Sequence, residues 1–245
     1  MRVLSLFSGG GLGDYGLELA GMEIVGQVEI DDYCQKILKL RWPDVPKWRD
    51  IREVKGADLP ACDLISGGFP CQPFSVAGKR RGKEDDRNLW HEMYRIITTT
   101  RPAWVLAENV GGSIPMVVEK VCSDLEALRY ETLPLYLPAF PFGVDHKRYR
   151  IWIVANDHGQ RREGGREKPL QRITKLPWSE DERRIEINRI RRHIPAPVFR
   201  RASDGPPYWV ERLKLLGNGQ VVQVVEWIGK QIMAFEASRP DERGG

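Results

Sequence analysis

The chain has 245 residues, 41% of them hydrophobic and 29% charged, with a net charge of +4. This composition is typical of one globular domain, or of one domain with a small appendage. No apolar run is long enough to span a bilayer, and the N-terminus lacks a signal-peptide pattern, so we expect a cytoplasmic protein without a membrane partner. The four cysteines form no C-x-x-C pair, which argues against a disulfide framework or a metal site.

The positive charge is concentrated in one part of the chain. Residues 147–201 hold 16 Lys and Arg against 7 Asp and Glu, a local net charge of +9, whereas the rest has 22 against 27, or −5. Such a concentration indicates contact with a polyanion, and nucleic acid is the first candidate. A solvated, partly disordered arm would have the same composition.

A nucleotide-type site is predicted at the N-terminus. Residues 2–7 form a short apolar strand, a glycine-rich turn follows at 8–13, and a helix then runs to Gly21. Strand, glycine turn and helix bring a ligand against a helix N-terminus. By itself this turn would serve NAD, FAD, S-adenosylmethionine or only a change of direction.

The next segment adds an acid in the expected place. A second strand is predicted at 23–28, and Glu29 at its end is a candidate acceptor for ribose hydroxyls. We assign Asp31 as the N-cap of a helix at 32–41. The chain has no Gly-Lys-Ser/Thr loop, which removes support for ATP hydrolysis. A nicotinamide dehydrogenase stays open at this point.

The loop at 67–75, G-G-F-P-C-Q-P-F-S, is the centre of the chain's chemistry. It follows a short buried strand, and its two prolines stiffen the backbone around Cys71. A thiol held rigidly at a strand end can act as a nucleophile. The alternative is a cysteine that serves as a small buried apolar residue.

The polar stretch at 76–88 is predicted to be a loop that closes over a substrate. Its basic residues can bind phosphates, although a plain solvated loop has the same pattern. A helix then runs from Leu89 to about Thr100 and ends before Pro102.

A second reactive group follows the strand predicted at 104–107. Glu108 stands at its end and is expected on the same rim of the sheet as Cys71, where a carboxyl can exchange protons with a bound base. Residues 114–129 form an apolar core helix and 131–139 an extended run. Arg148 and Arg150 precede the strand 151–155 and share a face, because residues two apart in an extended chain point the same way.

The chain is predicted to divide into four parts. Residues 1–155 form the catalytic and cofactor-binding domain, and 156–205 a small, basic and irregular insert with an amphipathic helix at 179–193. Residues 206–236 return to the catalytic domain, and 237–245 form a disordered tail. Gly205 before the Pro-Pro pair argues against an amino-methyltransferase motif, which needs a polar side chain there.

Taken in order, these motifs resemble the cytosine-5 DNA methyltransferases of the compact, phage-encoded type. The series is F-S-G-G-G-L-G, Glu29, Asp50-Ile51, G-F-P-C-Q-P-F-S, E-N-V, K-R-Y-R and a late G-N-G-Q-V-V. The resemblance implies an α/β fold, with the Rossmann-like, doubly wound and mostly parallel sheet of S-adenosylmethionine-dependent methyltransferases. It also implies methylation of carbon 5 of a flipped cytosine in double-stranded DNA through a covalent cysteine adduct, as in restriction–modification systems of prokaryotes or phage-infected cells.

The resemblance also assigns roles to residues. The catalytic set is Cys71 as nucleophile and Glu108 as proton donor, supported by Asn109, Arg148 and Arg150. S-adenosyl-L-methionine is expected along Phe7, Ser8, Gly9, Gly11, Leu12, Gly13, Glu29, Ile30, Asp50, Ile51, Gly68, Pro70, Leu89, Asn218 and Gln220. DNA contacts are expected from Gln72, Ser75, Lys79, Arg80, Arg81 and Arg87.

The chain departs from the family pattern at several points. The family usually has Asp at position 5 and Gln at position 146, and its last motif lacks the Gly219-Gln220 pair. The recognition region is also normally much longer than 156–205. Two alternatives therefore stay open: a tRNA cytosine-5 methyltransferase of the same family, and a catalytically weak subunit that needs a partner chain or a second copy for target recognition.

Overall fold

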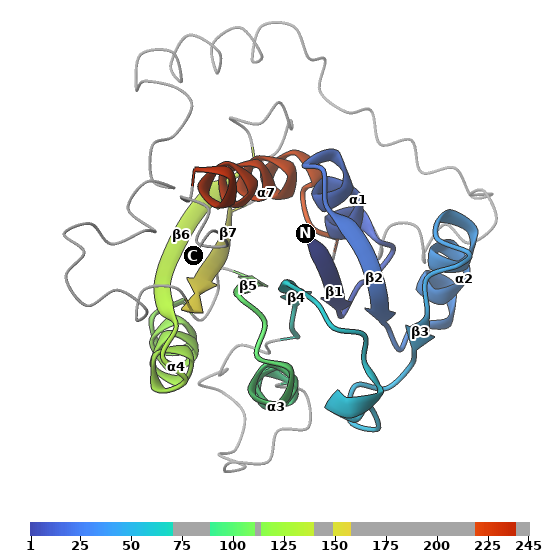
Figure 1. Ribbon diagram of the computed structural model, residues 1–245, viewed down its shortest axis with the longest axis horizontal. Helices are drawn as coiled ribbons and strands as arrows, with labels where there is room; N and C mark the ends of the chain where they lie inside the picture. Colours follow the sequence, from blue (N-terminus) through green and yellow to red (C-terminus); the bar gives the residue numbers. More distant parts are fainter. Residues whose placement is uncertain (71–88, 111–113, 140–148, 158–218, 239–245) are drawn as a thin grey trace, which may run out of the picture.

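The structure is a computed structural model that describes residues 1–70, 89–110, 114–139, 149–157 and 219–238. Seven strands form one sheet in the order β3-β2-β1-β4-β5-β7-β6 (Figure 1). Their bounds are β1 Arg2–Leu6, β2 Glu23–Val28, β3 Lys47–Trp48, β4 Leu64–Gly68, β5 Trp104–Val110, β6 Glu131–Pro138 and β7 Tyr149–Asn156. The pairings from β3 to β5 are parallel, whereas β7 is antiparallel to both β5 and β6.

Helices cover both faces of this sheet. Two apolar clusters define the layers: α1 (Leu12–Leu19), α2 (Asp32–Arg41) and α7 (Val222–Ala237) pack on one face, and α3 (Trp90–Thr100) and α4 (Ile114–Ala127) on the other. A short 3-10 helix, η1, spans Gly56–Asp58. The predicted Rossmann-like, doubly wound and mostly parallel architecture is confirmed.

The strands alternate between the two layers, as the period of two in an extended chain requires. In β5, Trp104 and Leu106 pack under α7, whereas Val105 and Ala107 pack against the α3 side. Both faces of the strand are therefore buried, which explains why these segments read as continuous apolar runs.

Local signals set the helix boundaries closely. Asp31 is the N-cap of α2 as predicted, because its carboxylate accepts hydrogen bonds from the backbone N–H groups of Tyr33 and Cys34 at 2.9 and 3.0 Å. The α4 helix ends at Ala127, two residues before its expected end. The predicted helix at 179–193 lies outside the described residues.

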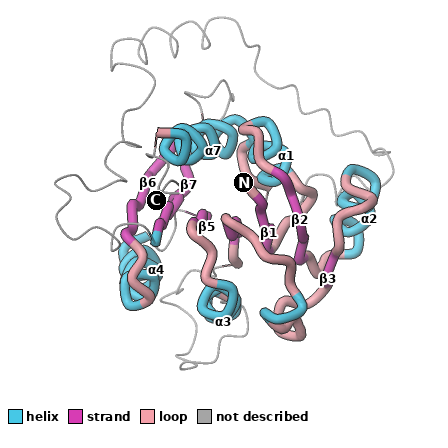
Figure 2. Tube along the Cα trace, viewed as in Figure 1, coloured by secondary structure: helices cyan, strands magenta, loops and turns pink. Residues whose placement is uncertain are grey.

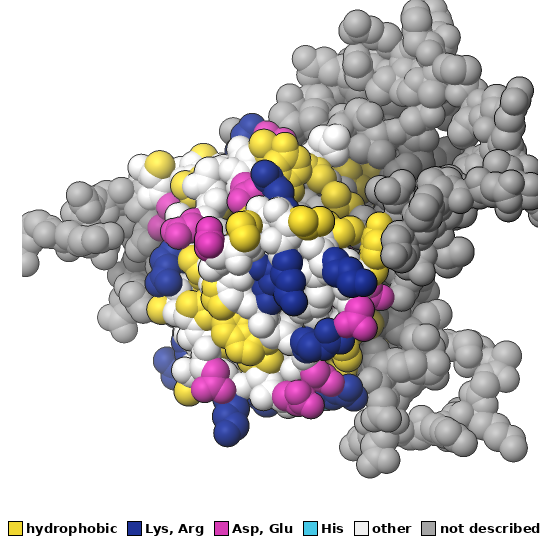
Figure 3. Space-filling view, turned by 90° about the vertical axis from the view of Figure 1, so that its right-hand side faces the viewer, with side chains coloured by type: hydrophobic (Ala, Val, Ile, Leu, Met, Phe, Trp, Pro, Cys, Tyr) yellow, Lys and Arg dark blue, Asp and Glu magenta, His cyan; other side chains and the backbone are white. Residues whose placement is uncertain are grey.

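The exposed side of α2 carries Lys36, Lys39 and Arg41. Figure 3 shows the corresponding face of the molecule, where Lys and Arg side chains gather near the middle and Asp and Glu side chains surround them. Across the described ranges, no helix combines the length and the apolar character needed to cross a membrane.

The C-terminal helix α7 lies beside α1 on the same face of the sheet (Figures 1 and 2). The two helices approach closely at glycines. An alanine Cβ at Gly16 would lie 2.7 Å from the Val222 carbonyl oxygen and 2.8 Å from the Val225 Cβ. An alanine Cβ at Gly229 would lie 2.7 Å from the Cβ of Ala20. This contact fixes the start of α7, and with it Gln220, over the first turn of α1.

We predict that Gly16→Ala destabilises the protein. Alanine raises helix propensity by up to about 1 kcal/mol, but the clash with backbone and Cβ atoms of α7 costs about 1–3 kcal/mol, so the loss should dominate. Urea unfolding measures the difference. Gln223→Ala, on the exposed side of α7, is the control and should change stability by less than about 0.5 kcal/mol. A Gly16→Ala protein as stable as the wild type would contradict the close packing of α1 and α7.

Candidate active site

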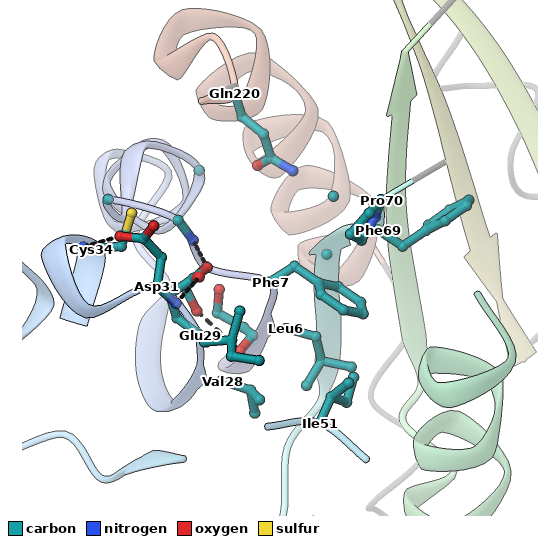
Figure 4. A pocket seen from close by; sticks show the side chains of 18 of the residues that line it. Leu6, Phe7, Val28, Glu29, Asp31, Cys34, Ile51, Phe69, Pro70 and Gln220 are labelled. Carbon is teal, nitrogen blue, oxygen red and sulfur yellow. Dashed lines mark hydrogen bonds between the residues drawn. The ribbon is translucent and has the colours of Figure 1, made fainter. Parts of the chain in front are cut away.

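One cavity of about 710 Å³ lies at the carboxyl ends of β1, β2, β4 and β5 (Figure 4). Ile30 and Asp50 line one end, and Glu108, Arg150 and Gln220 line the other. In an open parallel sheet, ligands bind in the crevice beyond the carboxyl ends of the strands. The cavity is therefore the candidate active site.

The glycine turn after β1 forms one wall. Phe7 takes a left-handed backbone conformation with φ 56°, which is uncommon for a residue with a side chain and points to a functional constraint. The Gly11 amide donates to the Ser8 carbonyl at 2.9 Å, and Gly11, with φ 78°, is the N-cap of α1. The turn thus aims the first turn of α1, with its unpaired N–H groups, at the cavity.

Glu29 joins this turn to the start of α2. One of its carboxylate oxygens accepts from the Gly9 amide at 2.7 Å and the other from the Asp31 amide at 2.8 Å (Figure 4). A carboxylate oxygen has two lone pairs, so each can accept a second hydrogen bond from a ligand. Glu29 is held in one orientation and keeps acceptor capacity.

The segment after β3 forms the far end of the cavity. Arg52 donates to both oxygens of Asp50 at 2.5–3.0 Å, and these hydrogen bonds lower the pKa of Asp50. Arg95 of α3 donates to the Ile51 carbonyl at 2.8 Å and fixes the segment from below. Ile30, although apolar, is 56% exposed at the cavity. This end offers an apolar surface beside a carboxylate.

Glu108 stands at the other end, on β5. Its side chain is 8% exposed, and its Oε1 lies 2.9 Å from the Nε of Arg150, which is 15% exposed. Trp152, fully buried, is opposite Glu108 in the pairing of β5 with β7. The carboxyl therefore sits in a largely dry environment, beside a guanidinium on the neighbouring antiparallel strand.

Asn109, next to Glu108, is hydrogen-bonded to the backbone just before Cys71. Its Nδ2 donates to the Phe69 carbonyl at 3.2 Å, and both residues are buried. Phe69 lies two positions before Cys71, and Pro70 lines the cavity. The hydrogen bond therefore joins the backbone at Phe69 to the end of β5.

Gln220, just before α7, reaches across the cavity mouth (Figure 4). An alanine Cβ at Gly13 would lie 1.9 Å from Gln220 Oε1. One at Gly68 would lie 3.2 Å from Gln220 Nε2 and 2.9 Å from Glu108 Oε2. The absence of side chains at these two glycines makes room for the amide between the glycine turn and the Glu108 carboxyl.

The cavity brings together many residues that the sequence singled out. Those that line it are Phe7, Ser8, Gly9, Leu12, Gly13, Glu29, Ile30, Asp50, Ile51, Gly68, Pro70, Leu89, Glu108, Arg150 and Gln220. Gly11 faces Trp42 instead, and Asn109 acts from behind the wall. Outside the described residues lie Cys71, Gln72, Ser75, Lys79, Arg80, Arg81, Arg87, Arg148 and Asn218.

The sequence analysis missed Asp14, which lines the cavity from the first turn of α1. Its carboxylate accepts from the Ser5 hydroxyl at 2.5 Å and from Gln27 Nε2 at 2.6 Å. Burial raises the pKa of Asp14 to about 6. An acid in the first turn of a helix ordinarily interacts favourably with the helix dipole. Only the apolar residues around Asp14 in the sequence could have indicated that its side chain is buried. Cys34 and Tyr33 of α2 also line the cavity and were not foreseen.

No group of three or more metal-ligating side chains occurs in the parts of the chain that the structure describes. The polar groups that line the cavity include carboxylates, guanidiniums and backbone amides.

Residues 1–198 match the C-5 cytosine-specific DNA methylase family. The chain belongs to this family.

Similar proteins within the family are bacterial Type II methyltransferases. M.FnuDI of Fusobacterium nucleatum is 37% identical over 159 residues, which cover 63% of this chain and 46% of the relative. M.HhaI of Haemophilus parahaemolyticus is 33% identical over 162 residues, covering 63% of this chain and 48% of the relative. The matched region thus spans about half the length of these curated relatives.

The fold is shared with a methylase of nearly the same extent. The crystal structure of Schizosaccharomyces pombe Dnmt2 methyltransferase matches with a TM-score of 0.66 and covers 98% of this chain and 100% of that chain. Sequence identity is 18%, so this likeness concerns the fold alone.

We predict that Arg150→Met destabilises the protein by about 3 kcal/mol, because it leaves the buried Glu108 carboxyl without its guanidinium. The double variant Glu108→Gln/Arg150→Met should regain much of that loss, since no charge is then left behind. Urea unfolding of the two single variants and the double variant gives the coupling. Strictly additive losses would show that the ion pair is not coupled in solution.

Proposed function

We propose that this protein is a DNA cytosine-5 methyltransferase that transfers a methyl group from S-adenosyl-L-methionine to carbon 5 of a flipped cytosine in double-stranded DNA. The observation that carries the proposal is the continuity of one cavity. It joins the glycine turn and Glu29 to the Glu108–Arg150 pair, beside the start of the P-C-Q loop. Membership of the cytosine-5 methylase family supports it.

The lining residues fit an adenosyl methionine. Glu29 offers fixed acceptors for ribose hydroxyls, and Ile30 and Ile51 offer apolar surface to a flat adenine. The N-terminus of α1 offers donors for a carboxylate. When bound, this group supplies an electrophilic methyl on a positively charged sulfur.

The chain's own groups would activate the cytosine. The Cys71 thiolate adds its electron pair to carbon 6. Glu108, which must carry or share a proton in this step, gives that proton to ring nitrogen 3, so the ring stays neutral and carbon 5 gains enamine character. Carbon 5 then forms the new bond to the methyl carbon, and the donor's sulfur keeps the electron pair of the bond that breaks. Water takes the proton from carbon 5, the thiolate leaves carbon 6 with the electron pair of its bond, and ring nitrogen 3 returns its proton to the Glu108 carboxylate, which restores the ring.

Two contacts support these roles. Arg150 holds one oxygen of Glu108 at 2.9 Å, which leaves the carboxyl in one orientation. Asn109 donates to the Phe69 carbonyl, two positions before Cys71, and would help to position Cys71. Arg148, two positions before Arg150 in the sequence, is expected to brace the base.

The target base must leave the DNA stack to reach such a cavity. The predicted partners in this step are Gln72, Ser75, Lys79, Arg80, Arg81 and Arg87, which belong to the loop after Cys71. Phosphate contacts from its basic members would hold the backbone, and polar members would fill the space that the base leaves. A tRNA substrate and a requirement for a partner chain or a second copy are the alternatives that the following experiment separates.

We predict that Cys71→Ser lowers methyl transfer by more than about a thousandfold, because a serine hydroxyl is a far weaker nucleophile than a thiolate. Its affinity for S-adenosylhomocysteine should stay within about twofold of the wild type. Labelled S-adenosylmethionine is incubated with random-sequence duplex DNA and, separately, with tRNA. DNA containing 5-fluorocytosine should trap a covalent complex with the wild type only.

The incubations with DNA and with tRNA distinguish the alternative functions. Label in tRNA and not in DNA would move the assignment to RNA, whereas cofactor binding without transfer to either would favour a subunit that needs a partner. Transfer that persists in Cys71→Ser would contradict the covalent route.

We further predict that Glu29→Gln lowers affinity for S-adenosylhomocysteine by about 10- to 100-fold. The amide places a donor where two backbone N–H groups and the ribose hydroxyls all need an acceptor. Isothermal titration calorimetry measures this. Glu23→Gln, exposed at the start of β2, removes the same charge and should leave affinity unchanged. Equal affinity in Glu29→Gln would place the ribose elsewhere.

A further inference from the structure

A buried acid lies beneath the glycine turn and has no part in the chemistry above. Asp14 is 2% exposed, Ser5 is 3% exposed and Gln27 is fully buried. The Ser5 hydroxyl and the Gln27 amide both donate to the Asp14 carboxylate, at 2.5 and 2.6 Å. Because these residues come from β1, β2 and α1, the carboxylate holds a fixed position in the cavity wall.

Burial in the cavity wall makes the charged form of Asp14 energetically unfavourable. Burial is the main reason that the pKa of Asp14 is raised to about 6, and the acids Glu18 and Glu29 raise it further. The two hydrogen bonds act in the opposite direction. Burial lowers the pKa of Lys47, on β3, and the charge of Asp14 is one of the influences that oppose this shift. Gln220, just before α7, brings an uncharged amide to the start of α1 at Gly13.

We propose that Asp14 is a specificity-determining residue that makes the cofactor site prefer a positively charged sulfonium ligand over its neutral thioether product. The inference rests on the proposed function. S-adenosylmethionine and S-adenosylhomocysteine carry the same ammonium and carboxylate groups and differ by one methyl group and one positive charge. The effect of Asp14 on the shared groups therefore cancels when the two affinities are compared.

The position of Asp14 makes this effect measurable. It lines the same cavity as its neighbour Gly13, where an alanine Cβ would lie 1.9 Å from Gln220 Oε1. Charges that interact through a partly dry cavity wall feel each other more strongly than charges in water. A fixed anion there stabilises a cation in the cavity and contributes nothing to a neutral sulfur.

The sign of the pH dependence follows from linkage. Below pH 6 Asp14 is mostly protonated and neutral, and above it the negative charge appears. Affinity for the sulfonium should therefore rise relative to the thioether as pH increases through about 6. We expect the ratio of the thioether Kd to the sulfonium Kd to increase roughly three- to tenfold between about pH 5 and 7.5.

Asp14→Asn is a suitable test variant because its shape fits the same network. The Asn oxygen can accept from Ser5. Its amide can donate to Gln27 Oε1, a buried atom without a hydrogen-bond partner among the described residues, once the Gln27 side-chain amide turns over. The variant removes the charge and keeps the connection between α1 and the sheet. Glu23→Gln removes an exposed charge from β2 and is the matched control.

The experiment is calorimetric titration of both ligands into wild type, Asp14→Asn and Glu23→Gln across this pH range. The expected result is a ratio that rises with pH in the wild type and in Glu23→Gln, and a flat ratio in Asp14→Asn. If Asp14 had a purely structural role, Asp14→Asn would lower both affinities together, and the ratio at each pH would equal that of the wild type.

Two results overturn the proposal. One is a flat ratio in the wild type, which decides the matter even if Asp14→Asn does not fold. The other is a pH-dependent ratio that persists in Asp14→Asn. Failure of the proposed function looks different, because the wild type would then bind neither ligand, and both inferences would fall. Binding of both ligands with a pH-independent ratio overturns only the role of Asp14.

Discussion

The parallel pairing of β1, β4 and β5 is the constraint on which the site depends. Strands that run in one direction end at one rim, so the glycine turn after β1, the Phe69-Pro70 segment after β4 and Glu108 near the end of β5 meet there. The reversed strand β7 then contributes Arg150 at the same rim from its beginning, not from its end. An antiparallel strand at this place puts a guanidinium beside a carboxyl that lies far from it in the sequence.

Three acids of the cavity show how environment separates their roles. Glu29 receives two backbone amides and is held as an acceptor. Glu108 is buried beside a guanidinium and an indole, where an approaching base would meet little competing water. Asp14 has hydroxyl and amide donors, and burial makes its charge depend on pH. The same functional group thus stands in three different environments within one cavity.

The segment that leads into α7 contributes to the cavity, although it lies far from the other lining residues in the sequence. Packing of α7 on α1 at Gly16 and Gly229 positions Gln220 between Gly13 and Gly68, next to Glu108. The Gly219-Gln220 pair, a departure from the usual last motif of the family, therefore lines the cavity. The glycine turn, the Glu108 carboxyl and the C-terminal helix are linked through contacts that involve four glycines, Gly13, Gly16, Gly68 and Gly229.

Sequence alone was sufficient for what local rules control. The apolar runs, the glycine turn and the Asp31 cap predicted β1, β2, α1 and α2 within a residue or two, because propensity, capping and backbone freedom act over a few positions. The order of motifs identified the family, and the position of Glu29 after β2 followed from the topology of a parallel sheet. Glu108, expected just after a strand at 104–107, instead lies inside β5, because pairing with β7 continues the strand to Val110.

Only the tertiary structure decided which of these residues meet. The reversal of β7, the pairing of Arg150 with Glu108, the hold of Asn109 on Phe69 and the burial of Asp14 against Ser5 and Gln27 all join positions far apart in the chain or on different elements. No local pattern encodes such contacts, because they arise when strands take their places in the sheet and helices pack over it. Ionisation and orientation are set there, since both depend on which neighbours exclude water.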